Sequence, residues 1–419
     1  MARIEPLKTL RYDPRVVGSL DAVTAPPYDV IDDAERAALA AKSPFNVVEI
    51  DLPRANGGDP YLHAQTTLDA WRQQGVLVRE SEPAIWALTQ DYTGPDGQAR
   101  TRHGFLCRVR VEDYGPGRIR PHERTHPGPK EDRLRLTRAT RTNLSPIFSL
   151  FEDREQAAWH ALEPYTKEEP FGSATDPDGT VNKLWRVSDG AAIESVQKTL
   201  SDRELLIADG HHRYETARVY AEEVGGEGEH RYVLMFLCSL SDPGLTIFAT
   251  HRLLTDLTDN RRAALAETLE RDFESTPTSA EQLEPGPGEP GIVLGYLDRF
   301  NRQPTRLRLR DQSIADAALP DKPEPYRRLD TAVLEALVLE GALGMNEDDI
   351  SHLNGLNYSK DTADARAAVG DGRADAAFFM RATPVEQVRE VAEAGESMPP
   401  KSTFFFPKIP TGLVFNPLE

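Results

Sequence analysis

The hydrophobic positions of this chain alternate between two periods. Short continuous or alternating apolar runs predict strands, and apolar residues spaced by three and four predict amphipathic helices. The predicted strands are residues 43–52, 83–92, 102–111, 147–151, 205–208, 232–239, 245–250, 292–297, 305–309 and 376–381. The predicted helices are residues 61–74, 329–343 and 385–394, together with helices that begin near 129 and 211. This order predicts an α/β protein with mixed sheets and several β-hairpins, with α+β as the alternative.

Turn residues divide these elements into groups. Gly94-Pro-Asp-Gly predicts a hairpin between 83–92 and 102–111, and Asp242-Pro-Gly predicts a second between 232–239 and 245–250. The Pro- and Gly-rich segment 284–291 is the clearest linker, so we expect a main domain over 1–283 and a smaller α/β portion over 292–419. The aromatic segment 401–415 predicts a buried terminal hairpin.

Composition restricts the class of protein. The chain has 419 residues, 39% of them apolar, and a net charge of −19, which indicates a soluble globular protein without a nucleic-acid partner. No apolar run is long enough for a membrane span, so we expect a cytoplasmic protein with no membrane partner. Cys107 and Cys238 are the only cysteines, which excludes a disulfide framework. The pattern indicates no particular oligomeric state.

The segment 205–219 carries the strongest chemical signal. A short apolar strand meets an Asp209-Gly210 turn, and His211, His212 and Arg213 then open a helical period. The first turn of a helix presents unpaired backbone N–H groups and the positive end of the helix dipole, which together favour a phosphate. Asp209 would lie beside that site as a carboxylate able to accept a proton or to bind Mg²⁺.

A basic segment forms the second candidate. Residues 118–141 contain seven Arg and one Lys against three acidic residues, in a chain that is strongly acidic overall. Arginine donates two parallel hydrogen bonds to a phosphate, so the segment predicts anion contacts, although single arginines could instead pair with nearby acids on a solvated helix. The candidates for phosphate contact are Arg124, His126, Lys130, Arg138, Arg141 and Asn143.

Two matches to well-known motifs lie in the wrong context. Residues 286–291 satisfy G-x-G-x-x-G, but two prolines interrupt them and a strand follows, so a dinucleotide fold is not indicated. His122-Glu-Arg-Thr-His126 satisfies H-E-x-x-H, but Pro127 ends any helix after one turn. A metal-dependent hydrolase that uses His122 and His126 therefore stays an alternative, and a polar ligand-binding loop is favoured.

Near the N-terminus, Ala-Pro-Pro-Tyr-Asp-Val-Ile at 25–31 predicts a rigid extended segment that ends in a carboxylate. Asp29 is either the N-cap of a helix that begins near Asp32 or an acid of the active site. Glu123 and Asp29 are thus rivals of Asp209 for the role of catalytic base.

Several segments carry a resemblance to known families. Pro-Pro-Tyr-Asp-Val-Ile at 26–31, Pro-His-Glu-Arg-Thr-His-Pro-Gly-Pro-Lys-Glu-Asp-Arg at 121–133 and Pro-Lys-Ile-Pro-Thr-Gly-Leu-Val at 407–414 resemble a large prokaryotic family, domain of unknown function 1015. Locally, Asp-Gly-His-His-Arg at 209–213 is similar to the nucleotide-phosphate motif of the ParB/sulfiredoxin superfamily. His211 stands where sulfiredoxins carry their nucleophilic cysteine, so sulfinic acid reduction is excluded.

The second resemblance implies a ParB/sulfiredoxin-like nucleotide-binding core, and the free-serine kinases are its nearest functional match. It implies transfer of a phosphoryl group from ATP or ADP, with Mg²⁺, to a small hydroxylated metabolite such as L-serine. In that reading Gly210, His211, His212 and Arg213 bind phosphate, and Asp209 orients or deprotonates the hydroxyl. A nucleotide-binding regulatory protein without turnover is the further alternative.

Overall fold

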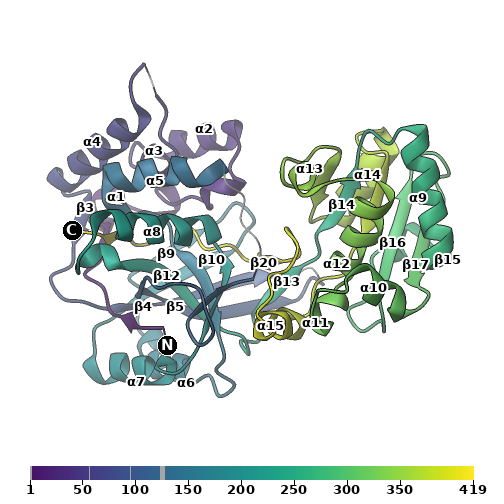
Figure 1. The fold of residues 1–419 in the computed structure, drawn as a ribbon. Coiled ribbons are helices and arrows are strands. Elements are labelled where there is room, and N and C mark those ends of the chain that lie inside the picture. Colours follow the sequence, from purple (N-terminus) through teal and green to yellow (C-terminus); the bar gives the residue numbers. More distant parts are fainter. Residues whose placement is uncertain (1, 56, 95, 123–127) are drawn as a thin grey trace. The chain divides into compact units, whose positions relative to one another are not determined.

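A computed structural model describes residues 2–55, 57–94, 96–122 and 128–419, with the side chains of 128–130 and of Ser351 left aside. The chain forms two compact units (Figure 1). Unit 1 comprises residues 1–121, 127–246 and 407–419, and unit 2 comprises 122–126 and 247–406. This boundary near 246 differs from the one that the Pro- and Gly-rich segment 284–291 suggests. Every helix in the described ranges is too short or too polar to span a bilayer.

The main sheet of unit 1 is mixed, as the sequence predicts for an α/β protein. Its path is β6-β11-β8-β12-β5-β4-β10-β9, and β1 adds to β5. The pairs β6/β11 and β8/β12 are parallel, whereas the other pairs are antiparallel. The strands are β1 (Ile4–Glu5), β4 (Ile85–Thr93), β5 (Ala99–Arg110), β6 (Ile119–Pro121), β8 (Ile147–Phe151), β9 (Gly172–Thr175), β10 (Val181–Val187), β11 (Leu205–Asp209) and β12 (Tyr232–Ser239).

Helices cover both faces of this sheet. Figure 1 shows α4, α5 and α8 on one side of it and α6 and α7 on the other. The helices are α1 (Pro14–Val17), α2 (Asp33–Lys42), α3 (Val48–Asp51), α4 (Pro60–Gln73), α5 (Gly128–Thr140), α6 (Ala157–Leu162), α7 (Gly190–Leu200) and α8 (His211–Val224), with short 3₁₀ turns η1 (Leu20–Ala22), η2 (Tyr28–Val30), η3 (Glu163–Lys167) and η4 (Glu229–Arg231). A continuous core joins the sheet to α6, α7 and the buried side of α8.

Two small sheets complete unit 1. The first pairs β2 (Leu10–Tyr12) with β3 (Leu77–Arg79), and the second pairs β7 (Thr142–Asn143) with β21 (Asn416–Pro417). Through β21 the C-terminal residues lie within unit 1, where an isolated bridge also joins Thr411 to Ala25. The expected terminal hairpin is therefore wrong, although the segment is buried as predicted.

Unit 2 is built on a second, antiparallel sheet. Its order is β15-β17-β16-β19-β14-β18, and α9 packs against β15. The strands are β14 (His251–Leu254), β15 (Phe273–Pro277), β16 (Val293–Asp298), β17 (Thr305–Leu309), β18 (Leu356–Ser359) and β19 (Ala376–Phe379). The helices are α9 (Asp259–Asp272), α10 (Gln312–Ala318), α11 (Glu324–Arg327), α12 (Asp330–Leu334), which continues as the π-helix η6 (Glu335–Ala342), α13 (Glu347–Ser351), α14 (Thr362–Asp371) and α15 (Val385–Glu393), with the 3₁₀ turn η5 (Ala280–Gln282).

Two other sequence predictions are wrong. Residues 43–52 form the turn before α3 and α3 itself instead of a strand, and in that turn the amide oxygen of Asn46 accepts the N–H of Val48 at 3.1 Å. The strand after Asp242 does not return along β12. It is β13 (Thr246–Phe248), which pairs with β20 (Phe404–Phe406).

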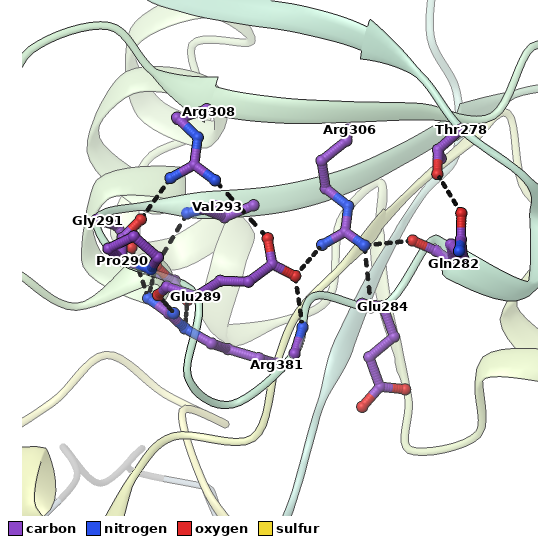
Figure 2. A network of polar contacts seen from close by, with 12 residues as sticks. Thr278, Gln282, Glu284, Glu289, Pro290, Gly291, Val293, Arg306, Arg308 and Arg381 are labelled. Carbon is purple, nitrogen blue, oxygen red and sulfur yellow. Dashed lines mark hydrogen bonds and ion pairs between the residues drawn. The ribbon is translucent and has the colours of Figure 1, made fainter.

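The Pro- and Gly-rich segment 284–291 is a loop of unit 2 held by arginines (Figure 2). Arg306 donates to Glu289 at 2.7 Å, and Arg308 donates to the carbonyl of Pro290 at 2.5 Å. Arg381 donates to the carbonyl of Gly291 at 2.7 Å and also forms a bidentate ion pair with Asp330, 2.6 Å and 3.0 Å. Arg381 therefore connects this loop to the start of α12.

The Arg381–Asp330 pair gives the first prediction. Each side chain is only 8% exposed, and burial raises the pKa of Asp330 to about 6 while Arg381 opposes that rise. Asp330→Asn leaves a buried guanidinium without its counter-charge, so we expect a loss of about 3 kcal/mol of unfolding free energy at pH 8.

Native-state hydrogen exchange of the β16 and β19 amides measures this loss in unit 2. Tryptophan fluorescence would report on unit 1 instead, because all four tryptophans lie there. Glu324→Gln is the matched control, because it breaks an exposed ion pair with Arg328. The side chains of Glu324 and Arg328 are 62% and 61% exposed, so this variant should change the unfolding free energy by less than about 0.5 kcal/mol. Equal effects of the two variants would contradict the prediction.

Candidate functional site

The predicted strand, turn and helix around Asp209 are present in unit 1. β11 ends at Asp209, Gly210 adopts the left-handed conformation with φ of 90°, and α8 begins at His211. A Cβ on Gly210 would lie 2.9 Å from Nε and Cζ of Arg213. Glycine is thus required both by the backbone angle and by the approach of the Arg213 side chain.

Asp209 lies between two cations. Its Oδ1 is 2.5 Å from Nζ of Lys408, and its Oδ2 accepts a hydrogen bond from Nη2 of Arg213 at 2.6 Å. Burial alone would raise the pKa of Asp209, but Lys408 and Arg213 outweigh it and lower that pKa well below its ordinary value. Asp209 is therefore ionised at neutral pH, where it fixes two cations and is a weak proton acceptor.

Lys408 is the residue of this group that the sequence analysis missed. It follows unit 2 in the chain, and its own backbone is held by the hairpin β4–β5. Gln90 donates to the carbonyl of Lys408 at 3.0 Å, and Arg102 donates to the carbonyl of Pro407 at 2.5 Å. Lys408 belongs to the segment 407–414 that carries the family resemblance. That resemblance is the sequence signal that could have identified Lys408 as a site residue.

Arg102 is fully buried between aromatic rings. Its guanidinium lies 4.6 Å from the ring centre of Phe148 and 5.5 Å from that of Phe236, and its Nε donates to Gln90 at 3.0 Å. Burial lowers the pKa of Arg102 to about 10, so it remains a cation at neutral pH. A rigid pair of side chains, Gln90 and Arg102, thus positions the backbone on either side of the Lys408 α-carbon.

Arg213 is anchored on its other side by the segment that precedes β8. Its Nη1 donates to Oγ of Ser145 at 2.9 Å and to the carbonyl of Pro146. Ser145 in turn shares a hydrogen bond of 2.9 Å with Thr411. Arg213 is 10% exposed, and this arrangement fixes its guanidinium in one orientation.

A small pocket of about 50 Å³ lies beside α8 in unit 1. Arg213, Thr216, Ser145, Arg133 and Tyr28 are among the residues that line it. The guanidinium of Arg133 stacks on the ring of Tyr28 at 4.3 Å, and burial raises the pKa of Tyr28 to about 12.

The three family segments therefore converge on the motif at 209–213. Tyr28 belongs to 26–31 and Arg133 to 121–133, and both line the pocket with Arg213. Lys408 belongs to 407–414 and pairs with Asp209. Segments that lie far apart in the chain therefore meet beside Arg213.

Two of the predicted basic residues, Arg138 and Arg141, form ion pairs away from the motif. Arg138 pairs with Glu223 near the far end of α8, and Arg141 pairs with Glu419 at 3.3 Å. Asn143 lines the pocket, but its amide oxygen accepts from the backbone of Leu234 at 3.1 Å. The side chains of Arg138 and Arg141 are 42% and 61% exposed, which fits solvated ion pairs better than phosphate contacts.

The other predicted site residues lie in α8, in η2 and outside the described ranges. His211 and His212 form the first turn of α8 and are partly buried. Asp29 is exposed in η2, and the N-cap of α2 is Asp32, so the capping interpretation of Asp29 is wrong. Glu123, Arg124 and His126 and the side chain of Lys130 lie outside the described residues.

His122 is buried in unit 2. Its Nε2 lies 2.6 Å from Oγ1 of Thr403, and its ring packs edge-on against Phe405. Within the described ranges, no group of three or more His, Cys, Asp or Glu side chains could hold a metal ion. Both oxygens of Asp209 are engaged by cations, so the described residues do not fit a Mg²⁺ site and we assign no ligand to that ion.

The chain is an α/β protein in which a strand, a left-handed turn and a helix hold the Asp209 carboxylate between Arg213 and Lys408. The chain belongs to the family described as protein of unknown function (DUF1015), whose model matches residues 4–332. No curated protein matches the chain by sequence.

Solved structures show distant likenesses. A conserved hypothetical protein from Pyrococcus furiosus is 16% identical with a TM-score of 0.36, and the match covers 70% of this chain and 92% of that one. A free serine kinase in complex with AMP is 16% identical with a TM-score of 0.36, and the match covers 70% of this chain and 88% of that one. C-terminally truncated SbnI from Staphylococcus aureus is 10% identical with a TM-score of 0.37, and the match covers 73% of this chain and 85% of that one. Likenesses at this level carry no inference about activity.

The geometry at Gly210 yields the second prediction. Gly210→Ala should lower the unfolding free energy by about 1–2 kcal/mol, because a Cβ is strained at a positive φ and the close approach of Arg213 adds to that cost. Tryptophan fluorescence during urea unfolding reports this loss in unit 1. Gly190→Ala, at the first position of α7 and with open space around it, should be neutral or slightly stabilising. A neutral Gly210→Ala would contradict the account of this turn.

The ion pairs of Asp209 yield the third prediction. The folded-state pKa is lowered, so the stabilisation is complete above the unfolded-state pKa of about 4 and is lost as pH falls below it. Asp209→Asn should therefore be about 3 kcal/mol less stable than the wild type at pH 7, and the difference should shrink at pH 3. Urea unfolding at both pH values measures it, and a difference independent of pH would contradict the assignment.

Proposed function

We propose that this protein is a nucleotide-dependent phosphotransferase that acts on a small hydroxylated metabolite. The observation that carries the proposal is the Asp209 carboxylate held between Lys408 and Arg213 at the first turn of α8. Phosphoryl transfer needs a cradle for phosphates, positive charge near the transferred group and a carboxylate that orients the acceptor hydroxyl. This arrangement offers all three within unit 1.

Each residue has a role in that reaction. The amides of the first turn of α8, with His211, His212 and Arg213, would bind the phosphates of ATP or ADP. Lys408 would neutralise charge on the transferred group, as a preorganised cation does in a dry site. Asp209 would accept a hydrogen bond from the acceptor hydroxyl and so orient it. Because the pKa of Asp209 is lowered, its carboxylate is a weak base and contributes little to removal of the hydroxyl proton.

The transfer itself is a simple displacement. The acceptor oxygen attacks the terminal phosphorus, a new P–O bond forms, and the bond to the bridging oxygen breaks as the shortened nucleotide leaves with that electron pair. The hydroxyl proton passes to solvent or to a phosphate oxygen. Mg²⁺ would arrive with the nucleotide, and no step here depends on a ligand from the described residues.

A phosphorus NMR experiment tests the activity. Purified full-length protein is incubated with Mg²⁺, ATP or ADP, and a pool of hydroxylated metabolites that includes L-serine, the first acceptor to test. We expect a new phosphomonoester signal, and division of the pool identifies the acceptor. Nucleotide binding with no transfer to any acceptor would favour a regulatory nucleotide-binding protein, and absence of both binding and transfer would contradict the proposal.

Two variants test the assigned roles and make the fourth prediction. Lys408→Met should lower turnover by about 10²–10³-fold, the usual cost of one preorganised charge stabiliser, and leave nucleotide affinity within about tenfold. Asp209→Asn should abolish turnover with the same limited effect on affinity. Lys198→Met, on the exposed side of α7, is the matched control and should have full activity. Full activity of Lys408→Met would show that Lys408 takes no part in the reaction.

A further inference from the structure

A row of polar side chains crosses one face of the main sheet. Arg102 on β5 lies directly opposite Gln90 on β4, and Gln90 lies directly opposite Asn182 on β10. Residues directly opposite on neighbouring strands share a face, and all three of these residues have 0% exposure. A buried polar group costs free energy unless it has a partner, so the partners of this polar row decide what it stabilises.

Hydrogen bonds run through the polar row in one direction. Nε of Arg102 donates to Oε1 of Gln90 at 3.0 Å. Nε2 of Gln90 then donates to Oδ1 of Asn182 at 2.7 Å and to the carbonyl of Lys408 at 3.0 Å. Nδ2 of Asn182 donates in turn to the carbonyl of Ala174 on β9 at 3.1 Å. Gln90 and Asn182 thus each accept from one neighbour and donate to the next.

The two ends of the polar row fix that direction. A guanidinium is only a donor and a backbone carbonyl is only an acceptor, so Arg102 requires an oxygen from Gln90 and the Ala174 carbonyl requires a nitrogen from Asn182. A Gln90 amide turned by 180° would present its nitrogen to Arg102 and its oxygen to the Lys408 carbonyl. Both contacts would be repulsive, so a single orientation of the Gln90 amide fits its surroundings.

We propose that Asn182 is a positioning residue for Lys408. Its amide oxygen holds the Gln90 amide in the orientation that donates to the Lys408 carbonyl, and the fixed backbone keeps the lysine ammonium against Asp209. The consequence for catalysis rests on the proposed function, whereas the consequence for the position of Lys408 is independent of it.

Loss of Asn182 would act through the second N–H of the Gln90 amide. Nε2 of Gln90 has two N–H groups, and its two printed partners are Asn182 and the Lys408 carbonyl. Without the Asn182 oxygen, one of these donors is left unsatisfied at a position with no exposure, and the amide gains free energy by turning to another acceptor. The Lys408 carbonyl then loses its donor, although Lys408 itself is unchanged.

Two variants and a matched control test this role. Asn182→Ala removes the acceptor for Gln90. Gln90→Glu has the same shape and still accepts from Arg102, but a carboxylate cannot donate to the Lys408 carbonyl. Gln197→Glu is the control, because Nε2 of Gln197 on α7 also donates to a backbone carbonyl, that of Ile4, at 3.0 Å.

Acylation of lysine side chains on the full chain measures the position of Lys408 without any assay of activity. The probe is an N-hydroxysuccinimide ester of acetate at pH 8, and mass spectrometry compares Lys408 with the exposed Lys198. Lys408 is 19% exposed and paired with Asp209, so it should react slowly in the wild type. Asn182→Ala and Gln90→Glu should raise its rate by about tenfold, the size of one lost hydrogen bond, and Gln197→Glu should leave it within about twofold.

Steady-state kinetics of phosphoryl transfer measure the catalytic consequence. Asn182→Ala should lower kcat by about tenfold and leave the KM for the nucleotide within about twofold, because the polar row contacts the backbone of Lys408 and not the first turn of α8. A loss of stability alone would lower the amount of folded enzyme, which urea unfolding of each variant measures separately.

Other outcomes have definite meanings. Wild-type acylation of Lys408 in both Asn182→Ala and Gln90→Glu, or an equal rise in Gln197→Glu, would overturn the inference. If Asn182→Ala does not fold, the comparison of Gln90→Glu with Gln197→Glu decides the outcome. Faster acylation of Lys408 in a protein that transfers no phosphoryl group would sustain the positioning role and defeat the proposed function. Faster acylation with an unchanged kcat would overturn the catalytic part of the inference and leave the proposed function standing.

Discussion

The site depends on one buried arrangement of charges, the Asp209 carboxylate between Lys408 and Arg213. Each cation is needed by the carboxylate, because burial alone would favour its neutral form. Each cation is in turn held by groups far away in the chain: Arg213 by the segment before β8, and the backbone of Lys408 by Gln90 and Arg102 of the β4–β5 hairpin. This contact thus connects the strand-turn-helix motif to the central sheet and to the C-terminal segment.

Segments that carry the family resemblance meet in this arrangement. Residues 26–31 contribute Tyr28 and residues 121–133 contribute Arg133, which stack on each other beside Arg213. Residues 407–414 contribute Lys408, and Thr411 from the same segment reaches Ser145. Four separated segments thus contribute to this site, and the anion-binding role that we propose for the start of α8 would use the two cations at its centre.

The sequence predicted the local elements well where the signal was local. The strand at 205–208, the Asp-Gly turn and the helix from 211 are all present, as are the hairpin at 85–110 and the strands at 293–298 and 305–309. The strand predicted at 43–52 is wrong because an apolar run does not distinguish a strand from a buried helix. Lys408 was missed because almost two hundred residues separate it from Asp209, and no periodic pattern reports a contact of that range. Arg138 and Arg141 pair with Glu223 and Glu419, and a count of charges in the sequence does not show which acids lie opposite such arginines.

The most direct test of the central claim is a crystal structure of the protein with a non-hydrolysable ATP analogue. The account predicts phosphate oxygens within hydrogen-bond distance of the amides in the first turn of α8 and of Nζ of Lys408, with the carboxylate of Asp209 still in contact with Arg213. A nucleotide bound away from α8, or crystals that stay free of nucleotide at saturating concentration, would contradict it.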